Sequence, residues 1–245
     1  MKKILILGAS SEIAHATCKI YARLGYKFVL MARDKDKLKT IAQDLRNRGA
    51  SDVKCFIMDI NKISEHSRLI KKTFIFLGSI DITLISHGTL PDQIACERSA
   101  KLTAKELNTN AISTILFLTN LANELEKHKK GIIAVITSVA GDRGRASNYV
   151  YGSAKAMVST FLQGLRGRLA KKGIHIVDIK PGIVETRMTA HLKKRFFWAN
   201  PDKIAKEIMQ AISKEKHSVY APWHWWLIMK FVNFIPEFIF KKIKL

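Results

Sequence analysis

Cysteine is scarce in this chain, and its placement excludes the sites that cysteine most often builds. The three cysteines, Cys18, Cys55 and Cys96, lie far apart, without a Cys-x-x-Cys pair or a Cys/His cluster of metal-ligand spacing. We therefore expect no metal site, and the pattern suits a reducing cytoplasm.

Long apolar runs are also missing. The opening Met1-Lys2-Lys3 resembles the start of a signal peptide, but the apolar run that follows stops after residues 4–7, at Gly8. A buried first strand is the better interpretation. The 245 residues contain no internal repeat, low-complexity tract or linker, and 47% of them are hydrophobic, so we expect one α/β domain.

Acidic residues are few: 20 Asp and Glu stand against 42 Lys and Arg, which gives a formal charge of +22. Such a charge favours phospholipid headgroups, nucleic acid or phosphorylated substrates. Only the net charge supports a nucleic-acid partner, because the sequence holds no zinc finger, aromatic RNA-binding motif or basic heptad arm. We expect no nucleic-acid partner.

Six short runs rich in Ile, Val and Leu alternate with segments of helical period. The runs cover residues 4–7, 28–31, 53–58, 80–85, 132–137 and 174–179. The helical segments cover residues 12–24, 34–48, 62–77, 99–128, 148–172 and 201–213. Continuous apolar strands between helices predict a doubly wound parallel sheet of the Rossmann type, covered on both faces.

Residues 222–245 depart from this pattern, so we divide the chain into a Rossmann domain, 1–221, and an apolar, basic tail. Apolar residues surround the predicted tail helix, but Lys230 and Pro236 interrupt it before the ~20 residues that a membrane span needs. Tryptophans 223, 225 and 226 and the terminal lysines suit an anionic headgroup boundary. The alternative is a contact between subunits.

Gly8 directly follows the first strand, and Ser10 and Ser11 can cap the next helix, whose N-terminal amides would receive a pyrophosphate. Arg33 stands just past the second strand, where dinucleotide domains read the adenosine ribose. An arginine there pairs with a 2′-phosphate, so the sequence favours NADPH over NADH. A solvated arginine at a helix start is the alternative.

Tyr151 and Lys155 share one face of a predicted helix, at the spacing i and i+4. A nearby ammonium lowers the pKa of a phenol towards neutrality, so Tyr151 could protonate a carbonyl oxygen. Ser138 lies thirteen residues earlier, at the carboxyl end of a strand, where parallel-sheet enzymes place their chemistry.

This combination, with Pro181-Gly182 after the sixth strand, resembles the short-chain dehydrogenase/reductase family over residues 3 to 221. The resemblance implies that Ser138 binds the substrate oxygen, Tyr151 is the acid, Lys155 also holds the nicotinamide ribose, and Asn110 relays protons. It also implies further cofactor contacts, at Ile13, Asp59, Ile60, Gly88, Pro181, Gly182, Val184 and Thr186.

Some positions depart from the family's pattern. Glu12 and Ala14 stand where the glycine motif usually has glycine, so the turn must point Glu12 outwards. His87-Gly88 replaces part of the usual Asn-Asn-Ala-Gly, and we expect no catalytic role for His87. The alternative interpretation of Asp59 is a purely structural helix cap.

The stretches 138–151, 181–193 and the tail resemble one subgroup of the family, the decaprenylphosphoryl-2-keto-pentose reductases; so do Gly88, Leu90, Asp92 and Gln93. This implies reduction of a polyprenyl-phosphate-linked 2-keto-pentose to an arabinose product for cell-wall polysaccharide synthesis. It also implies a flavin-dependent partner oxidase and a peripheral position on the inner face of the cytoplasmic membrane. Family members commonly form homo-oligomers.

A lipid-phosphate substrate needs cations, and the two loops that would border the site supply several. We expect phosphate contacts from Arg143, Arg145, Arg187 and Lys193. The alternative is a solvated basic face.

Two other functions remain open. A soluble reductase of acyl thioesters would use the same catalytic set, although the tail argues against it. A non-catalytic lipid-binding scaffold would explain Glu12 and Ala14, although intact Tyr151 and Lys155 argue against it.

Overall fold

The computed structural model of the chain describes residues 1–190 and 198–243. Its strands are β1 (Lys3–Leu7), β2 (Lys27–Ala32), β3 (Asp52–Ile57), β4 (Ile82–Ile85), β5 (Gly131–Ile136), β6 (Ile174–Pro181) and β7 (Ser218–Ala221). Its α-helices are α1 (Glu12–Arg23), α2 (Lys35–Asn47), α3 (His66–Leu77), α4 (Gln93–Glu97), α5 (Ala100–Leu107), α6 (Ser113–His128), α7 (Tyr149–Leu169), α8 (Pro201–Ser213), α9 (His224–Phe234) and α10 (Glu237–Phe240).

The described strands form one sheet in the order β3-β2-β1-β4-β5-β6-β7, and every neighbouring pair is parallel. The order reverses direction between β1 and β4, which confirms the predicted doubly wound sheet. In such sheets ligands bind outside the carboxyl ends of the strands at this reversal. The functional site is therefore expected beside Leu7 and Ile85.

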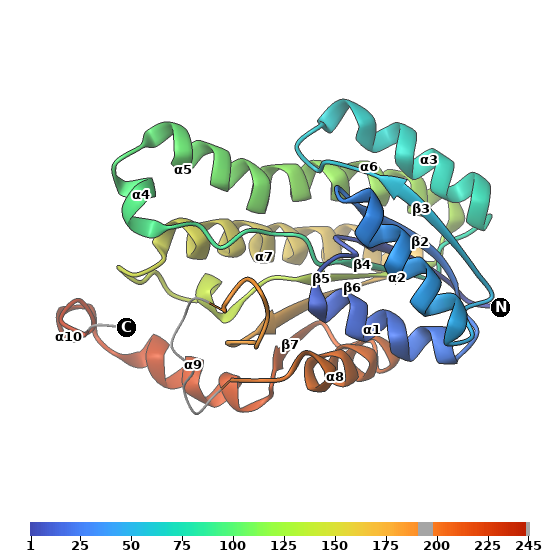
Figure 1. Ribbon diagram of the computed structural model, residues 1–245. Helices are drawn as coiled ribbons and strands as arrows, with labels where there is room; N and C mark the ends of the chain where they lie inside the picture. The colour runs from blue at the N-terminus through green and yellow to red at the C-terminus, as the bar shows by residue number, and fades with distance from the viewer. Residues whose placement is uncertain (191–197, 244–245) are drawn as a thin grey trace.

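Helices cover both faces of the sheet (Figure 1). On one face α1, α2 and α8 bury a core that includes Ile13, Leu38 and Ile208. On the other face α3, α6 and α7 bury a second core that includes Phe117 and Leu162. Burial on both faces explains why the strands are continuous in Ile, Val and Leu rather than alternating with polar residues.

The predicted helix 99–128 contains a π-helical turn in the structure. After α5, residues Asn108–Ile112 form a π-helical turn, and α6 continues from Ser113. A π turn inserts one residue into the helical repeat and occurs often at functional sites. Asn110 lies in the middle of this turn.

The tail begins as a packed part of the fold. In α9, Trp225 and Met229 are buried against Val139, one residue after Ser138. From there α9 leads away from β7 along the edge of the molecule, and α10 lies beyond its far end (Figure 1). Among the described residues, no helix combines the length and the apolar character required to cross a bilayer.

Candidate active site

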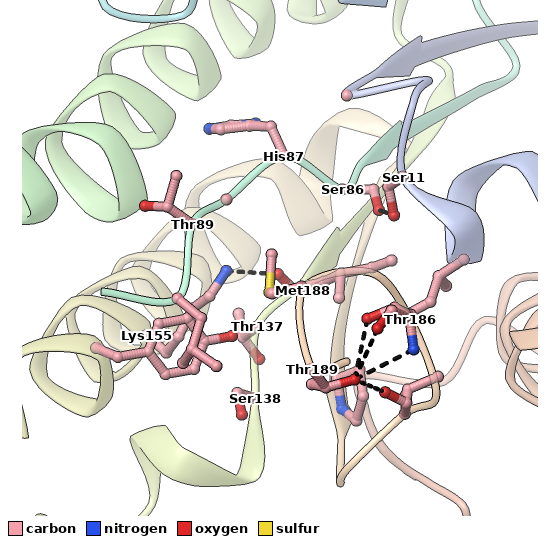
Figure 2. A pocket seen from close by; sticks show the side chains of 18 of the residues that line it. Ser11, Ser86, His87, Thr89, Thr137, Ser138, Lys155, Thr186, Met188 and Thr189 are labelled. Atoms are coloured by element: carbon pink, nitrogen blue, oxygen red, sulfur yellow. Dashed lines mark hydrogen bonds between the residues drawn. The ribbon is translucent and has the colours of Figure 1, made fainter. Parts of the chain in front are cut away.

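A cavity of about 580 Å³ opens at the carboxyl ends of the central strands. Gly8 and Arg33 line it at one end, and Ser138, Tyr151 and Lys155 line it at the other. Figure 2 shows Ser138 and Lys155 on one side of this space and Ser11 with Ser86 on another. The structure therefore brings the predicted catalytic set and the predicted glycine turn to one continuous site.

Gly8 makes the turn between β1 and α1. Its φ of +80° is unfavourable for residues with a side chain, and an added β-carbon would lie 2.5 Å from the backbone nitrogen of His87. Ser11 caps α1, because its Oγ accepts a hydrogen bond from the Ala14 amide at 3.5 Å, and Ser86 donates to the same oxygen at 2.9 Å. The hydrogen bond from Ser86, the residue after β4, thus holds the turn in place. The start of α1 faces the cavity, as predicted.

His87 is half-buried in the wall of the cavity, and its Nε2 lies 2.9 Å from the Thr114 hydroxyl. Burial, aided by the charges of Lys155, His66 and Arg33, lowers the pKa of His87 to about 3. The imidazole is neutral at physiological pH and cannot donate a proton as a cation.

The end of the cavity near Gly8 also has groups suited to an adenosine. Arg33, at the exposed start of the β2–α2 connection, lines the cavity together with Asp59 and Ile60. The Asp59 Oδ1 accepts a hydrogen bond from the Asn61 amide at 3.0 Å, so Asp59 caps a turn while it lines the cavity. The two interpretations of Asp59 from sequence are compatible.

Ser138 follows β5 and stands at the start of a short turn, where its Oγ accepts a hydrogen bond from the Ala140 amide at 3.1 Å. The α7 helix approaches this turn closely, since a β-carbon on Gly152 would lie 2.7 Å from the Ala140 carbonyl oxygen. Glycine next to Tyr151 therefore lets the tyrosine reach Ser138.

The pKa of Tyr151 differs from the expectation. Burial raises it to about 12, and a hydrogen bond with Ser138 opposes this rise. The prediction that Lys155 lowers the pKa of Tyr151 is wrong for the free chain. The Lys155 ammonium donates a hydrogen bond to the Ile136 carbonyl at 3.2 Å and lies 5.6 Å from the centre of the phenol ring. Tyr151 is thus a fully protonated phenol at neutral pH.

Lys155 is 5% exposed, an unusual burial for a lysine. Burial lowers its pKa to about 8, and the negative charge of Asp178 opposes this fall. Asp178 is itself buried on β6, where its Oδ1 accepts a hydrogen bond from the Thr137 hydroxyl at 2.5 Å. The buried lysine therefore has a buried counter-charge on the neighbouring strand.

Asn110 and Gly88 adjoin the lysine. The Asn110 Oδ1 accepts from the Thr89 amide at 2.8 Å, and its Nδ2 donates to the Glu106 carbonyl at 3.1 Å. A β-carbon on Gly88 would lie 3.0 Å from Asn110 Oδ1 and 3.5 Å from Lys155 Nζ. The structure thus gathers the residues expected to relay protons at one place.

The segment after β6 closes the cavity. Pro181, Gly182, Val184 and Thr186 all line it, as does Ile13 of α1. The Thr186 amide donates to the Thr189 hydroxyl at 3.1 Å, a contact visible in Figure 2. These five residues, all expected to touch the cofactor, therefore lie at the cavity.

The four cations expected to bind a substrate phosphate lie in different surroundings. Arg145 lines the cavity, and so does Arg187, which is hydrogen bonded to the carboxylate of Glu12 and, at 3.1 Å, to the Ser10 carbonyl. Arg143 is not among the lining residues. Lys193 lies outside the described residues.

Arg143 instead holds the tail. Its guanidinium donates to the carbonyls of Val232 and Ile235, at 2.5 and 2.7 Å, and pairs with Glu237 at 3.0 Å. It also stacks over the Phe240 ring at 3.7 Å. These contacts were not foreseen from the sequence, because they join residues about ninety positions apart.

Glu12 is directed to Arg187. Burial raises the pKa of Glu12, but the hydrogen bonds and charge of Arg187 outweigh this effect and leave the pKa below its ordinary value. The carboxylate is thus ionised and paired at the cavity edge. Ala14 is fully buried, and its small side chain packs in the core.

The sequence comparisons identify the family to which this site belongs. The model of the short chain dehydrogenase family matches residues 2–195. The chain belongs to the short-chain dehydrogenase family. Members of this family are NAD(P)-dependent oxidoreductases, and the cavity that joins the glycine turn to Ser138, Tyr151 and Lys155 fits a nicotinamide dinucleotide.

The relatives of this short-chain dehydrogenase are named in general terms. An uncharacterised oxidoreductase of Mycobacterium tuberculosis is 30% identical over 240 residues, which cover 98% of this chain and 96% of the relative. One from Staphylococcus aureus is 29% identical over 220 residues, which cover 88% and 93%. These names support an oxidoreductase function and do not identify the substrate.

A solved structure has the same fold. The alcohol dehydrogenase of the archaeon Thermococcus sibiricus, complexed with 5-hydroxy-NADP, superposes with a TM-score of 0.77 at 22% identity, over 90% of this chain and 95% of the other. At this identity the likeness establishes the fold of the short-chain dehydrogenase.

Several lining residues were missed by the sequence interpretation, among them Asn148 and Trp225. Asn148 precedes α7, and Trp225 comes from α9 in the tail. Nothing in the sequence indicated that residues 3 and 74 positions from Tyr151 would meet at the same cavity. The tail is part of the active site.

Proposed function

We propose that this chain uses NADPH to reduce the keto group of a polyprenyl-phosphate-linked keto-sugar. The observation that carries the proposal is a cation, the half-buried Arg145, in the wall of a cavity that the tail residue Trp225 also lines. An arginine in the wall of a cavity favours a substrate with an anionic group. A tail rich in exposed apolar residues favours a substrate delivered from lipid.

The residues of the site divide the reaction between them. When bound, the nicotinamide cofactor supplies the hydride for the carbonyl carbon. Tyr151 gives its proton to the carbonyl oxygen, so the C=O π bond is replaced by one C–H and one O–H bond. Ser138 holds that oxygen, and Lys155 with Asn110 returns a proton to Tyr151.

Arg33 supports NADPH as the cofactor. Its guanidinium stands beside the cavity after β2, where a 2′-phosphate would add two negative charges to the ribose. An arginine binds phosphate oxygens through two parallel hydrogen bonds, whereas a carboxylate in this place would select a free hydroxyl. Asp34, the next residue, is engaged as the cap of α2.

The outward side of α9 and α10 supports attachment to an anionic membrane surface from the cytoplasmic side. Leu227, Phe231, Phe234 and Phe238, which we name the outer face, are between 51% and 82% exposed. Lys230, Lys241 and Lys242 accompany them. Apolar side chains inserted among headgroups, with lysines beside them, give interfacial binding. A flavin-dependent partner oxidase on the same membrane would supply the ketone.

A reductase of acyl thioesters is the second candidate, because its chemistry would need the same Ser138, Tyr151 and Lys155. The substrate experiment separates the two. Purified protein in detergent is offered NADPH or NADH with either a short polyprenyl-phosphate 2-keto-pentose or an acetoacetyl thioester, and cofactor oxidation is followed by absorbance.

The proposal predicts oxidation of NADPH with the keto-sugar lipid, at a kcat/KM about tenfold or more above that with NADH or with the thioester. Turnover of the thioester with none of the keto-sugar would contradict it and favour the second candidate. The variant Tyr151→Phe controls for oxidation that does not arise at this site.

A further inference from the structure

An ion pair joins two distant parts of the chain that line the active-site cavity. Glu12 is the first residue of α1, and Arg187 follows β6. Arg187 Nε donates a hydrogen bond to Glu12 Oε1, and the Arg187 amide donates to the same oxygen at 3.4 Å. Arg187 Nη2 donates to the Ser10 carbonyl at 3.1 Å. The segment after β6 is thus attached to the turn between β1 and α1.

A compact turn carries Arg187. The Thr189 amide donates to the Thr186 carbonyl at 3.1 Å, and the Thr189 hydroxyl donates to the Val184 carbonyl at 2.6 Å. The Thr186 amide donates to that hydroxyl at 3.1 Å (Figure 2). These contacts hold the backbone around Arg187 without help from Glu12. The contact with Glu12 therefore serves mainly to fix the guanidinium.

The turn to which Arg187 is attached is the one that would receive the pyrophosphate of the cofactor. In dinucleotide-binding folds the pyrophosphate lies at the N-terminus of the helix after the first strand, where backbone amides and the helix dipole favour an anion. Glu12 stands in the first turn of this helix, so its carboxylate by itself would repel the phosphates. Arg187 compensates for that charge at the same place.

The Arg187 guanidinium has further donors to offer. A guanidinium carries five N–H groups, and the hydrogen bonds to Glu12 and Ser10 use two of them. The side chain of Arg187 is 64% exposed, so the remaining donors are accessible to a ligand. An exposed ion pair contributes little to folding stability, so substitution of either residue should leave the fold intact.

We propose that Arg187 binds the pyrophosphate of the dinucleotide cofactor and that Glu12 is a positioning residue that holds the Arg187 guanidinium beside it. We name these two residues the clasp. Arg187 keeps its contacts with Glu12 and Ser10 and donates its remaining N–H groups to phosphate oxygens. The inference goes beyond the proposed function, because it needs a dinucleotide cofactor and no particular substrate. It replaces the expectation that Arg187 binds a phosphate of the substrate.

The first test measures cofactor binding without substrate. The purified protein is titrated calorimetrically with NADPH and, separately, with NADH. The variant Arg187→Gln should weaken both cofactors by the same factor, about tenfold, because the pyrophosphate is common to them. Arg33→Gln should weaken NADPH alone, because only NADPH carries the 2′-phosphate. Unchanged affinity of Arg187→Gln for both cofactors would overturn the clasp.

The second test uses the direction of the effect at Glu12. Glu12→Leu removes a negative charge from the place where the phosphates bind, so a carboxylate that only repels them would make this variant bind more tightly. A positioning role predicts the opposite, a loss of about threefold or more for both cofactors. In the Arg187→Gln background the clasp is already broken, and Glu12→Leu should then tighten binding. Tighter binding by Glu12→Leu alone would overturn the role of Glu12.

The pair of Arg68 and Glu65 provides a matched control. The two side chains are 54% and 32% exposed, close to the 64% and 33% of Arg187 and Glu12, and pair at 3.4 Å. Neither residue lines the cavity. Arg68→Gln should therefore bind both cofactors as the wild type does. Thermal unfolding of each variant without cofactor shows whether the fold survives.

The outcomes separate the clasp from the proposed function. If Arg187→Gln weakens both cofactors while the keto-sugar lipid is not reduced, the proposed function fails and the clasp stands. If the lipid is reduced and Arg187→Gln binds both cofactors normally, the clasp alone fails.

Discussion

Lys155 is a cation held inside the protein under two opposing influences on its pKa. Burial withdraws water from the ammonium and lowers the pKa, and the carboxylate of Asp178 raises it. The resulting value of about 8 places the loss of the proton close to neutral pH. Asp178, fixed by the Thr137 hydroxyl, is thus a positioning residue that keeps Lys155 charged under working conditions.

The variant Asp178→Asn removes the counter-charge with little change of shape. The pKa of Lys155 should fall below about 8, because burial then acts without opposition. The ammonium is present below its pKa and lost above it, so the alkaline limb of the activity profile should move to lower pH. The profile of kcat/KM for NADPH measures this shift, since it reports groups of the free enzyme.

Asp81→Asn serves as the control for that profile. Asp81 is paired with Lys130 at 2.8 Å and binds the Lys3 amide at 2.9 Å, at the opposite end of the sheet from the cavity. Its removal should leave the alkaline limb in place. An alkaline limb that stays unchanged in Asp178→Asn would show that Asp178 does not act on Lys155.

Sequence identified the chemistry of single residues better than their surroundings. Ser138, Tyr151 and Lys155 follow from residue type and spacing, and the structure brings them together. The pKa of Tyr151 could not be foreseen, because it depends on how deeply the ring is buried. Likewise, Arg143 was expected near a phosphate and instead binds tail carbonyls, a choice made by tertiary packing.

At the scale of elements, periodicity predicted the strands that are buried on both faces. It missed β7 (Ser218–Ala221), an edge strand of four residues that is too short for a periodic signal. It predicted α5 and α6 as one helical segment, which is continuous in the structure, but did not indicate the π turn within it. The π turn between them keeps helical character in sequence but turns Asn110 towards Gly88.

The α9 helix has apolar residues on two sides with different neighbours. Trp225, Met229 and Val232 recur every three or four residues and pack with Val139 in one apolar cluster. Phe231 and Phe234 lie on the outer face, 73% and 82% exposed. An exposed apolar surface of this kind usually contacts a partner. We expect that partner to be a lipid surface.

The double variant Phe231→Ser, Phe234→Ser should lose binding to vesicles that contain phosphatidylglycerol, because it removes apolar surface without altering charge. Sedimentation with the vesicles measures the bound fraction, and added salt should weaken wild-type binding as it screens the lysines. Ile75→Ser, at an exposed position of α3, is the control. Undiminished sedimentation of the double variant would argue against the outer face.

At the scale of the whole molecule, the fold brings three distant parts of the chain to one cavity. The parallel sheet delivers the glycine turn and the catalytic serine at its carboxyl edge, and α7 supplies the tyrosine and lysine. The tail, which sequence set apart as residues 222–245, returns to this edge through Trp225. The sheet and α7 therefore supply the glycine turn and the catalytic residues, and the tail adds Trp225 to the same cavity.

We expect Tyr151 to protonate a carbonyl oxygen in a reaction that consumes NADPH. The variant Tyr151→Phe removes the hydroxyl and keeps the ring, and the steady-state rate of NADPH oxidation with the keto-sugar lipid tests it. A general acid contributes about 10²- to 10⁴-fold, so we predict a loss of at least about 100-fold in kcat with unchanged affinity for NADPH. A variant that retains the wild-type rate would contradict the mechanism.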